Sequence, residues 1–531
     1  MKYEIMSFVT PYGINLDLGQ NGKTWTFDVT DFATVLKGRK RMTIERGGQW
    51  MEDMDIQFLY IVGTPPRDVL DIQQIWRVES KNYSSIMSDN SFPPKDMPLN
   101  SNGQYFKVRS AISGHGQEGE FIPQAHYLNV NGGFEEFGWQ VWKECADNPV
   151  FPQGGTWIYD RAGWCPGMAT DVEESDLTPY ILGGQTTVEI DYGVYGGSGD
   201  SRYIANHQLV TYGPANFNLD ARVADIITPT SKVEYSKESI VCGQPTIVIQ
   251  NTGTTTLTTL DIEYWVNTTA TKQTYSWSGS LGFMEKEEVV LPVSTTLWSS
   301  ISGNDNTFFV EVMNPNGNTD EYNFNNTARS DFSIPDILPS SFILRFKTNI
   351  QGGESRIRLY DDNGSQLFFR QGMFGNTLYT DTFNLSPGCY ALVVEDTDDD
   401  GIDFWANNDG SGYCRIFRTD IPIILKSLEP DFGGSITYSF TVEYPLPTSS
   451  PEVAAPITVF PNPASGYFIL KGVSLDNATV SIYNAVGQQL QLPTFTSEDE
   501  ILFKTQDLSK GIYFVNIRIG EKLLTKKVII E

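Results

Sequence analysis

The chain has 531 residues, too many for one hydrophobic core, so its length predicts several domains. Its 65 acidic and 37 basic residues leave a net charge of −28, which argues against nucleic-acid binding because phosphate recognition needs a basic surface. With three histidines in the whole sequence, a histidine-rich metal centre is also disfavoured.

Turn-forming and aromatic residues predict an all-β fold class. The sequence holds 47 glycines, 28 prolines and 13% aromatic residues, a composition typical of short strands joined by tight turns. Apolar and polar residues alternate in several segments, for which we predict strands: 24–28, 55–62, 187–192 and 232–235. Residues 31–37 are expected to form one short helical turn, and no long amphipathic helix is predicted.

The five cysteines predict two disulfides. Cys145 and Cys165 lie 20 residues apart, Cys389 and Cys414 lie 25 residues apart, and Cys242 is left over as a buried thiol. The alternative is five unrelated buried thiols. Since disulfides are typical of exported proteins and residues 1–10 have no signal-peptide pattern, we expect the signal peptide to be missing from this sequence. No stretch approaches about 18 consecutive apolar residues, so no membrane span is predicted.

Changes in composition divide the chain into modules. We predict boundaries at 1–66, 67–220, 221–334, 335–446, a proline- and serine-rich linker at 447–456, and a last module at 457–531. In the third module, the phrases at 247–253 and 323–326 resemble CARDB-type immunoglobulin-like domains. The fourth module is expected to be an accessory β-sandwich.

The last module carries a recognisable series of short phrases. It opens with VFPNP at 459–463, continues with LSKGIYFV at 508–515, and ends in KKVIIE at 526–531. In this order the phrases resemble the C-terminal sorting domain of proteins exported by the type IX secretion system. The resemblance implies contact with that machinery and a secreted or cell-surface location in a bacterium that uses it. The alternative is a generic terminal β-domain.

The densest group of chemically active residues lies between positions 109 and 168. It includes Glu120 and the charged neighbours Asp160 and Arg161, which are placed between Trp157 and Trp164. Burying such a charged pair among tryptophans is costly unless the charges bind something. Tryptophan faces beside carboxylates also suit carbohydrates. The alternative is that Asp160 and Arg161 form an ion pair that braces a loop.

The run DRAGWCPGM at 160–168 resembles the signature of the peptide-N-glycosidase F family, as does the stretch 112–131. Further upstream, three short stretches resemble the latter part of that family's first domain: 10–12, 28–32 and 63–65. The resemblance covers about residues 4–215. It implies two jelly-roll sandwiches, the first of them incomplete, and hydrolysis of the amide that joins asparagine to N-acetylglucosamine in N-glycosylated proteins and glycopeptides. No catalytic cofactor is implied.

The resemblance also implies roles for individual residues. Glu120 matches the carboxylate that holds the active-site water, Arg161 matches an arginine near the scissile amide, and Cys145 and Cys165 match one family disulfide. We expect substrate contacts from six side chains: Trp50, His115, Phe121, Trp157, Asp160 and Trp164. His115 and Phe121 stand where the family has tryptophans.

The family's essential aspartate lies upstream of the segment that matches residues 10–12, so this chain begins after it. We therefore expect either an N-terminally truncated enzyme or a relative without this activity. The second functional class is a non-catalytic secreted protein that binds glycan or glycoprotein. A third, a copper monooxygenase-like protein, rests on fold kinship and is disfavoured by the low number of histidines.

An acidic loop in the fourth module predicts a structural calcium site. The run DTDDDGID at 396–403 places carboxylates at positions 1, 3 and 5 and glycine at position 6, as in the first half of a calcium loop. The expected ligands are Asp396, Asp398, Asp400 and Asp403. Position 12 is Asn407 instead of the usual glutamate, so an exposed acidic turn is the alternative.

Overall fold

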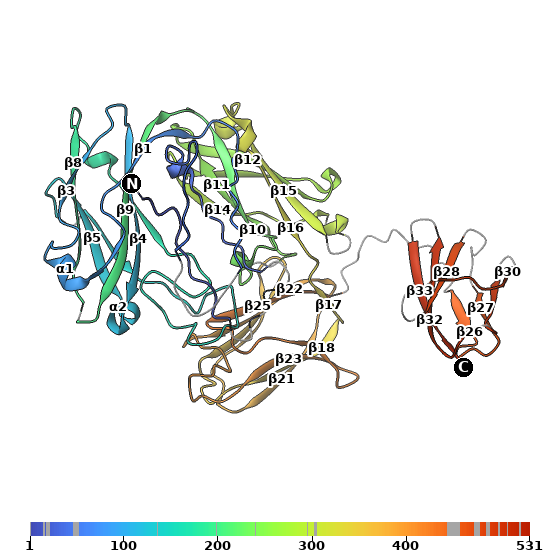
Figure 1. Ribbon diagram of the computed structural model, residues 1–531. Helices are drawn as coiled ribbons and strands as arrows, with labels where there is room; N and C mark the ends of the chain where they lie inside the picture. Colours follow the sequence, from blue (N-terminus) through green and yellow to red (C-terminus); the bar gives the residue numbers. More distant parts are fainter. Residues whose placement is uncertain are drawn as a thin grey trace. The chain divides into compact units, whose positions relative to one another are not determined.

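The computed structural model consists of two compact units, residues 1–446 and 447–531 (Figure 1). It describes residues 2–13, 16, 18, 22–45, 53–134, 136–197, 199–238, 241–294, 296–301, 305–442, 457–471, 478–484, 489–496, 500–506, 508–519 and 522–531. Nearly all regular structure in these residues is β-strand, so the predicted all-β, multidomain class is confirmed. Across the described residues, no helix is both long and apolar enough to span a membrane.

Residues 2–62 form no strand in their described part, so the strands predicted at 24–28 and 55–62 are wrong, and the sheet of an incomplete jelly roll is not seen there. The short helical turn is present as η1 (Thr30–Phe32). A segment with alternating residues becomes a strand only by pairing with a neighbour. Residues 61 and 62 instead are 96% and 98% exposed.

Residues 3–12 run along the next domain instead of building a sheet of their own. The backbones of Val9 and Met168 are joined by a hydrogen bond of 2.9 Å, and Gly167 N–H donates back to Val9 O at 2.9 Å. This pairing places Tyr12 close to the segment that contains Arg161.

Residues 67–220 form a two-sheet sandwich, in which Figure 1 shows β3, β5 and β8 alongside β1, β4 and β9. The first sheet has the order β1-β9-β4-β7, with β2 also on β9: β1 (Arg67–Gln74), β9 (Arg202–Ala215), β4 (Tyr105–His115), β7 (Val172–Asp176) and β2 (Glu79–Asn82). The second has the order β3-β8-β5-β6: β3 (Lys95–Pro98), β8 (Thr187–Val194), β5 (Gln124–Val130) and β6 (Phe137–Val141). Three short helices complete it: α1 (Tyr83–Met87), α2 (Gln117–Phe121) and η2 (Thr178–Tyr180).

Strand alternation explains the core of this sandwich. Along β4 every second residue is buried, which directs Phe106, Val108 and Ile112 between the sheets. The strand predicted at 187–192 is confirmed as β8. Because β4 leads directly into α2, the first sheet also fixes the start of the helix that carries Glu120.

The next domain is a seven-stranded antiparallel sandwich of the immunoglobulin-like kind, with sheets of three and four strands. The first sheet has the order β10 (Ala221–Thr228), β11 (Thr246–Asn251) and β14 (Lys286–Val290). The second has the order β13 (Gln273–Leu281), β12 (Leu257–Val266), β15 (Asn306–Met313) and β16 (Thr327–Phe332). The helical turns are η3 (Val233–Tyr235), η4 (Thr269–Thr271), η5 (Leu297–Ser300), η6 (Pro315–Gly317) and η7 (Asn323–Asn325). The more specific CARDB-type resemblance stays a prediction.

The strand predicted at 232–235 is wrong, because these residues form η3. The Tyr235 hydroxyl donates to Asp225 Oδ2 at 2.6 Å, and Lys232 pairs with the same carboxylate. The first and last residues of the segment therefore both contact Asp225, which favours a helical turn over an extended backbone.

The fourth domain is a sandwich of a five-stranded and a four-stranded sheet. The first has the order β17 (Asp336–Leu338), β25 (Ser435–Val442), β22 (Gly388–Asp396), β19 (Ser355–Asp361) and β20 (Gln366–Arg370). The second has the order β21 (Leu378–Asn384), β18 (Ser341–Lys347), β23 (Tyr413–Arg418) and β24 (Ile424–Ser427). The acidic loop connects β22 in one sheet to β23 in the other.

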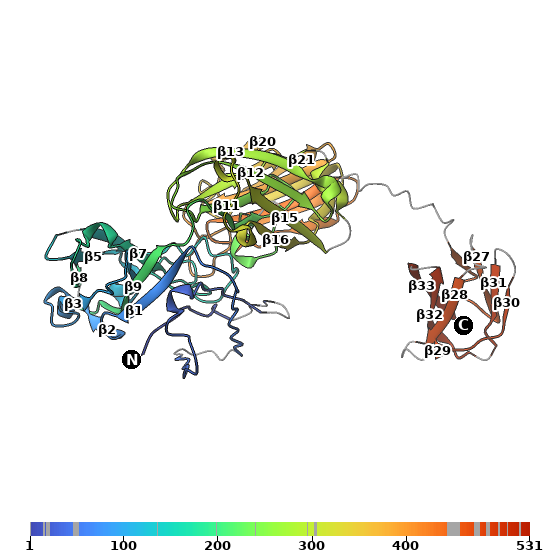
Figure 2. The same cartoon turned by 90° about the horizontal axis from the view of Figure 1, so that it is seen from above.

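The second unit is a small sandwich with its own core, which includes Phe468, Leu470 and Ile517. Figure 2 shows β32 and β33 on one side and β30 and β31 on the other. One sheet is β26 (Thr458–Phe460), β27 (Tyr467–Lys471), β31 (Glu500–Lys504) and β30 (Thr494–Thr496). The other is β29 (Gln489–Leu490), β28 (Ala478–Asn484), β32 (Gly511–Ile519) and β33 (Lys522–Ile530).

One predicted disulfide is confirmed and the other is wrong. Cys145 is bonded to Cys165, but Cys389 is bonded to Cys242, and Cys414 is a free, buried thiol. Side chains alternate along β22, so Leu392 and its inward-facing neighbours pack in the fourth domain's own core while Cys389 joins the core of the preceding domain. Cys414 packs in the fourth domain's core, on the wrong side of the sheet for Cys389.

This pairing predicts the result of peptide mapping. Digestion of the unreduced protein should yield a linked pair of peptides that contain Cys242 and Cys389, detected by mass spectrometry. Cys414 should resist alkylation until the protein is denatured, because burial raises the pKa of its thiol to about 12. A linked peptide pair that contains Cys389 and Cys414 would contradict the structure.

Candidate active site

Glu120 and Arg161, which are 41 positions apart, meet beside the first sheet of the 67–220 sandwich. Glu120 lies on α2, and its carbonyl accepts a hydrogen bond from Ala162 N–H at 2.9 Å. Arg161 forms an isolated β-bridge with Lys143. Backbone hydrogen bonds therefore hold both Glu120 and Arg161 in place, independently of their side chains.

The Arg161 side chain is completely enclosed, with 1% exposed. Its Nε donates to Glu120 Oε1 at 3.0 Å, and its Nη2 donates to Thr156 O at 2.9 Å. Its Nη1 donates to the Tyr159 carbonyl. Each guanidinium nitrogen therefore has a protein acceptor, and the group is well suited to hold Glu120 in one position.

Aromatic rings surround the guanidinium. The rings of Trp164, Phe121 and Tyr12 have their centroids 5.1, 5.2 and 5.8 Å from its central carbon. Such contacts favour the cation and exclude water from around it. Tyr12 was not among the predicted site residues, although it lies in the segment 10–12 that carries the family resemblance.

Glu120 is the more accessible member of the pair, with 20% of its side chain exposed. Burial raises the pKa of its carboxyl above the ordinary value of 4.5, and the charge and hydrogen bond of Arg161 partly oppose that shift. A partly exposed carboxylate with a raised pKa is suited to accept a proton from a bound water.

Asp160 has a structural contact in this site. Its Oδ1 accepts the backbone N–H of Cys145 at 2.8 Å, and Cys145 is bonded to Cys165. The alternative prediction of an ion pair between Asp160 and Arg161 is wrong, because Arg161 pairs with Glu120 instead. The carboxylate and the disulfide together brace the loop that presents Arg161.

The tryptophans predicted to contact substrate are mostly buried. Trp157 is 0% exposed, and its Nε1 donates to Asp431 Oδ1 at 3.2 Å, so its predicted sugar contact is wrong: the ring has no free face. Trp164 is 8% exposed, and its Nε1 donates to Gly114 O at 3.0 Å. The His115 ring stacks on Trp164 with a centroid distance of 5.9 Å. Trp50 lies outside the described residues.

Two exposed aromatic rings that the sequence did not single out lie around the same loop. Tyr159 is 43% exposed and directly precedes Asp160. Trp405, from the fourth domain, is 65% exposed, and its Nε1 donates to Gly155 O at 2.7 Å. Tyr159 lies two positions after Trp157, which was predicted to contact substrate. Trp405 lies 250 residues after Gly155, and no signal in the sequence could place it here.

Two of the histidines lie in the core of the 67–220 sandwich, away from the Glu120 pair. His126 and His207 are both 0% exposed, and their Nδ1 atoms bond to Tyr192 Oη at 2.9 Å and Ser110 Oγ at 2.8 Å. Burial lowers the pKa of each imidazole to about 3. Both rings are therefore neutral packing groups at ordinary pH.

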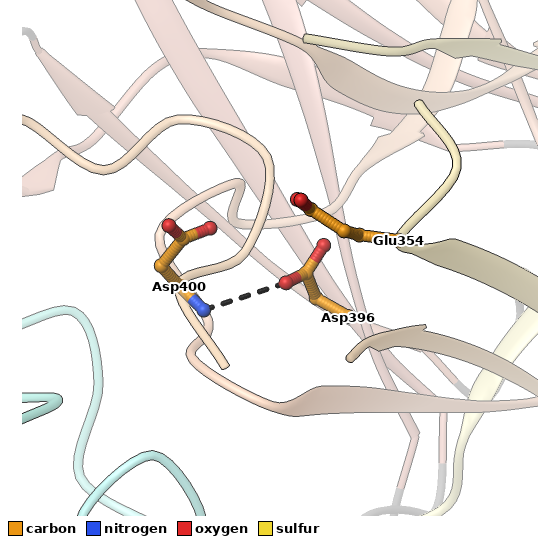
Figure 3. A group of neighbouring side chains, drawn as sticks. All are labelled: Glu354, Asp396 and Asp400. Carbon is orange, nitrogen blue, oxygen red and sulfur yellow. Dashed lines mark hydrogen bonds between the residues drawn. The ribbon is translucent and has the colours of Figure 1, made fainter. Parts of the chain in front are cut away.

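The structure divides the four predicted calcium ligands. Asp396 and Asp400 lie close to Glu354, which the sequence did not predict (Figure 3). Asp398 is exposed, and Asp403 Oδ1 accepts from Ser411 Oγ at 3.0 Å. Glu354 directly precedes β19, whose Ser355 pairs with Asp396 of β22, so strand pairing across the sheet brings it to the loop.

Comparison with known families now adds to this geometry. Residues 82–209 match the family model of the C-terminal domain of peptide-N-glycosidase F. Glu120 and Arg161 both lie inside that match. Residues 458–531 match a secretion system C-terminal sorting domain, which implies that the protein is secreted or placed at the cell surface.

Parts of the chain are similar to known proteins. Over 225 residues the chain is 26% identical to peptide-N(4)-(N-acetyl-beta-D-glucosaminyl)asparagine amidase F of Elizabethkingia miricola, covering 38% of this chain and 62% of that protein. A crystal structure of a peptide-N(4)-(N-acetyl-beta-D-glucosaminyl)asparagine amidase covers 40% of this chain and 75% of its own, with 23% identity and a TM-score of 0.30. That of PNGase F from Flavobacterium meningosepticum covers 29% and 55%, with 24% identity and a TM-score of 0.26.

Proposed function

We propose that this protein is an exported amidase that removes N-linked glycans from glycoproteins. The observation that carries the proposal is the Glu120–Arg161 pair, held on a fold segment similar to the C-terminal domain of peptide-N-glycosidase F. The sorting domain supports an extracellular place of action, where glycoproteins are available.

In the proposed reaction, a water molecule attacks the side-chain carbonyl carbon of the glycosylated asparagine. Glu120 takes a proton from the water and returns it to the nitrogen as the carbon–nitrogen bond breaks. The peptide keeps an aspartate, whose new oxygen comes from water, and the glycan leaves as a glycosylamine. The reaction needs no metal or organic cofactor.

Arg161 acts in this scheme as a positioning residue. Its guanidinium is enclosed and occupied by protein acceptors, so it holds Glu120 Oε1 and leaves the other carboxylate oxygen for the water. A fixed carboxylate needs little reorganisation during the reaction. In this proposal the exposed rings of Tyr159 and Trp405 stack on the sugar.

The test is hydrolysis of a purified N-glycopeptide in water enriched in heavy oxygen. The expected products are free glycan and a peptide in which aspartate, carrying one heavy oxygen, replaces the glycosylated asparagine. Mass spectrometry detects both. An unchanged glycopeptide, in the presence of a competent amidase control that converts it, would refute the proposal.

A non-catalytic glycan-binding protein is the second candidate. It is favoured by the complete enclosure of Arg161, which offers no donor to a substrate, and by the two exposed rings of Tyr159 and Trp405. Titration of the same glycopeptide distinguishes the two functions. Saturable binding without hydrolysis would support this candidate over the amidase.

A further inference from the structure

The loop that follows β22 is built around one buried carboxylate. Asp396 ends the strand and is 3% exposed. Its Oδ1 accepts the backbone N–H groups of Asp398 at 3.2 Å and Asp400 at 3.5 Å. Gly401 has a φ of 73°, a left-handed conformation that suits glycine, and lets the loop curl around the carboxylate.

Two carboxylate oxygens of this loop, and one of Glu354 next to it, are buried and have no hydrogen-bond partner in the described structure: Asp396 Oδ2, Asp400 Oδ1 and Glu354 Oε2. Figure 3 shows the three side chains converging on a common space. Buried polar atoms almost always have a hydrogen-bond partner, and burying one without a partner is costly, more so when it is charged. Three such oxygens in one place point to a cation-binding site.

Among the described residues, no basic side chain forms an ion pair with these three carboxylates, and the nearby Arg358 and Arg370 pair with Glu395 and Asp381. The charged neighbours that act most strongly on Glu354 are the carboxylates of Asp398, Asp396 and Asp400, so like charges repel one another here. A cation between the carboxylates would replace that repulsion with attraction.

The geometry favours calcium. One oxygen from each of the three carboxylates lies within 4.8 Å of the others. Two ligands of one calcium ion, each at about 2.4 Å, can be at most about 4.8 Å apart, so this spacing is compatible with one ion shared by all three. An all-oxygen donor set suits a hard cation and disfavours zinc or copper. The Asn407 amide donates to Asp400 Oδ2 at 2.6 Å, which orients the other oxygen toward the group.

We propose that Glu354, Asp396 and Asp400 bind a calcium ion, which fastens the fourth domain to the segment that carries Arg161. The contacts for the second part are direct. Asp396 N–H donates to Gly434 O at 2.8 Å, and Gly434 N–H donates to Ala146 O at 3.2 Å, beside Cys145. The loop's Phe404 packs against Trp157 in one buried cluster.

The first experiment measures calcium binding to the whole chain, freed of metal with a chelator, by titration calorimetry. One calcium ion should bind per chain, more tightly than magnesium, and at about 100 times the dissociation constant the melting temperature of the unit should rise by about 3 °C. No binding at millimolar calcium, or equal affinity for magnesium, would overturn the proposal. These readouts do not depend on the proposed amidase activity.

Variants separate ion binding from a structural role. Asp396→Asn keeps an oxygen for the two backbone N–H groups, and Glu354→Gln removes a charge from a partly exposed side chain; each should weaken calcium binding at least about tenfold, the loss of one charged ligand. Without calcium, Glu354→Gln should melt no lower than the parent, because it relieves repulsion. A calcium affinity equal to that of the parent would contradict the site. Asp420→Asn, whose carboxylate pairs with Arg418 at the far end of β23, is the matched control.

Hydrogen exchange tests the second part of the proposal. Calcium should slow the exchange of backbone amides in residues 145–161 of the parent and leave their exchange unchanged in Glu354→Gln. If calcium binds and exchange in this segment is unaffected, the ion does not fasten the domains and that part of the proposal fails.

Discussion

Replacement of Glu120 by glutamine is expected to lower kcat/KM for glycopeptide hydrolysis by about 10²–10⁴-fold, the usual contribution of a positioned acid–base group. Glutamine has nearly the same shape and keeps an oxygen to accept from Arg161 Nε, so the loop should be undisturbed. What it loses is the ability to take a proton from water. The rate is measured by mass spectrometry on the glycopeptide, with the melting temperature as a check of the fold.

Glu118→Gln is the matched control for this experiment. Glu118 lies on the same short helix, two positions earlier, and is not part of the Glu120–Arg161 pair. Its variant should hydrolyse the glycopeptide at a rate close to that of the parent. A Glu120→Gln protein that is folded and as fast as this control would remove Glu120 from the mechanism.

The pH profile tests how Arg161 acts. Only the ionised form of Glu120 can accept a proton, so the rate should fall as the pH falls through a pKa above 4.5. Arg161 lowers that pKa, so Arg161→Gln should move the acidic limb to higher pH, while Arg161→Lys, which keeps the charge, should move it less. A purely structural role for Arg161 would reduce the rate at every pH without moving the limb.

The buried histidines are expected to make the 67–220 sandwich sensitive to acid. The pKa of His126 and of His207 is about 3 in the folded protein, against 6.5 when the imidazole is exposed. Between these values the unfolded chain binds protons that the folded one does not, so this contribution to stability is lost as the pH falls below about 6.5. Between pH 7.5 and pH 5, each histidine should lower the free energy of unfolding by about 2 kcal/mol.

Comparison of each protein with itself at the two pH values isolates this effect. The double variant His126→Phe/His207→Phe should lose about 4 kcal/mol less than the parent between pH 7.5 and pH 5. Other groups that titrate, and the packing cost of the substitutions, cancel in this difference. Native-state hydrogen exchange of β4 and β9 amides gives the free energy for this sandwich alone. Equal losses in parent and variant would show that the imidazoles are not buried in their neutral form.

Patterns within one stretch of sequence predicted much of this protein. Alternation and turn residues predicted the all-β class, and they located β8 correctly. Local phrases identified the sorting domain, and the nearby Cys145 and Cys165 are bonded as expected. These features depend on neighbours along the chain, or on motifs whose parts lie close together.

Predictions that needed a partner from elsewhere in the chain were the ones that failed or were missed. The two faces of β22 cover different hydrophobic cores. Cys389 lies on the face that covers the core of the preceding domain, where it is bonded to Cys242. Trp157 is a residue type that often stacks on sugars, but packing against the fourth domain buries its ring. Segments 24–28 and 55–62 have strand patterns without a strand to pair with in the described residues.

The sequence by itself determined the fold class, the export signal at the C-terminus, and the pair of residues, Glu120 and Arg161, on which the proposed chemistry depends. Only the tertiary structure decided which distant groups come together. It placed the aromatic rings around Arg161, joined Cys389 to Cys242, and brought Glu354 beside Asp396 and Asp400. The physical reason is that the alternation of side chains along a strand is a local property of the sequence, whereas strand pairing, burial and charge depend on every segment that packs nearby. The function of a carboxylate depends on the segments that surround it, and these segments come together only when the chain folds.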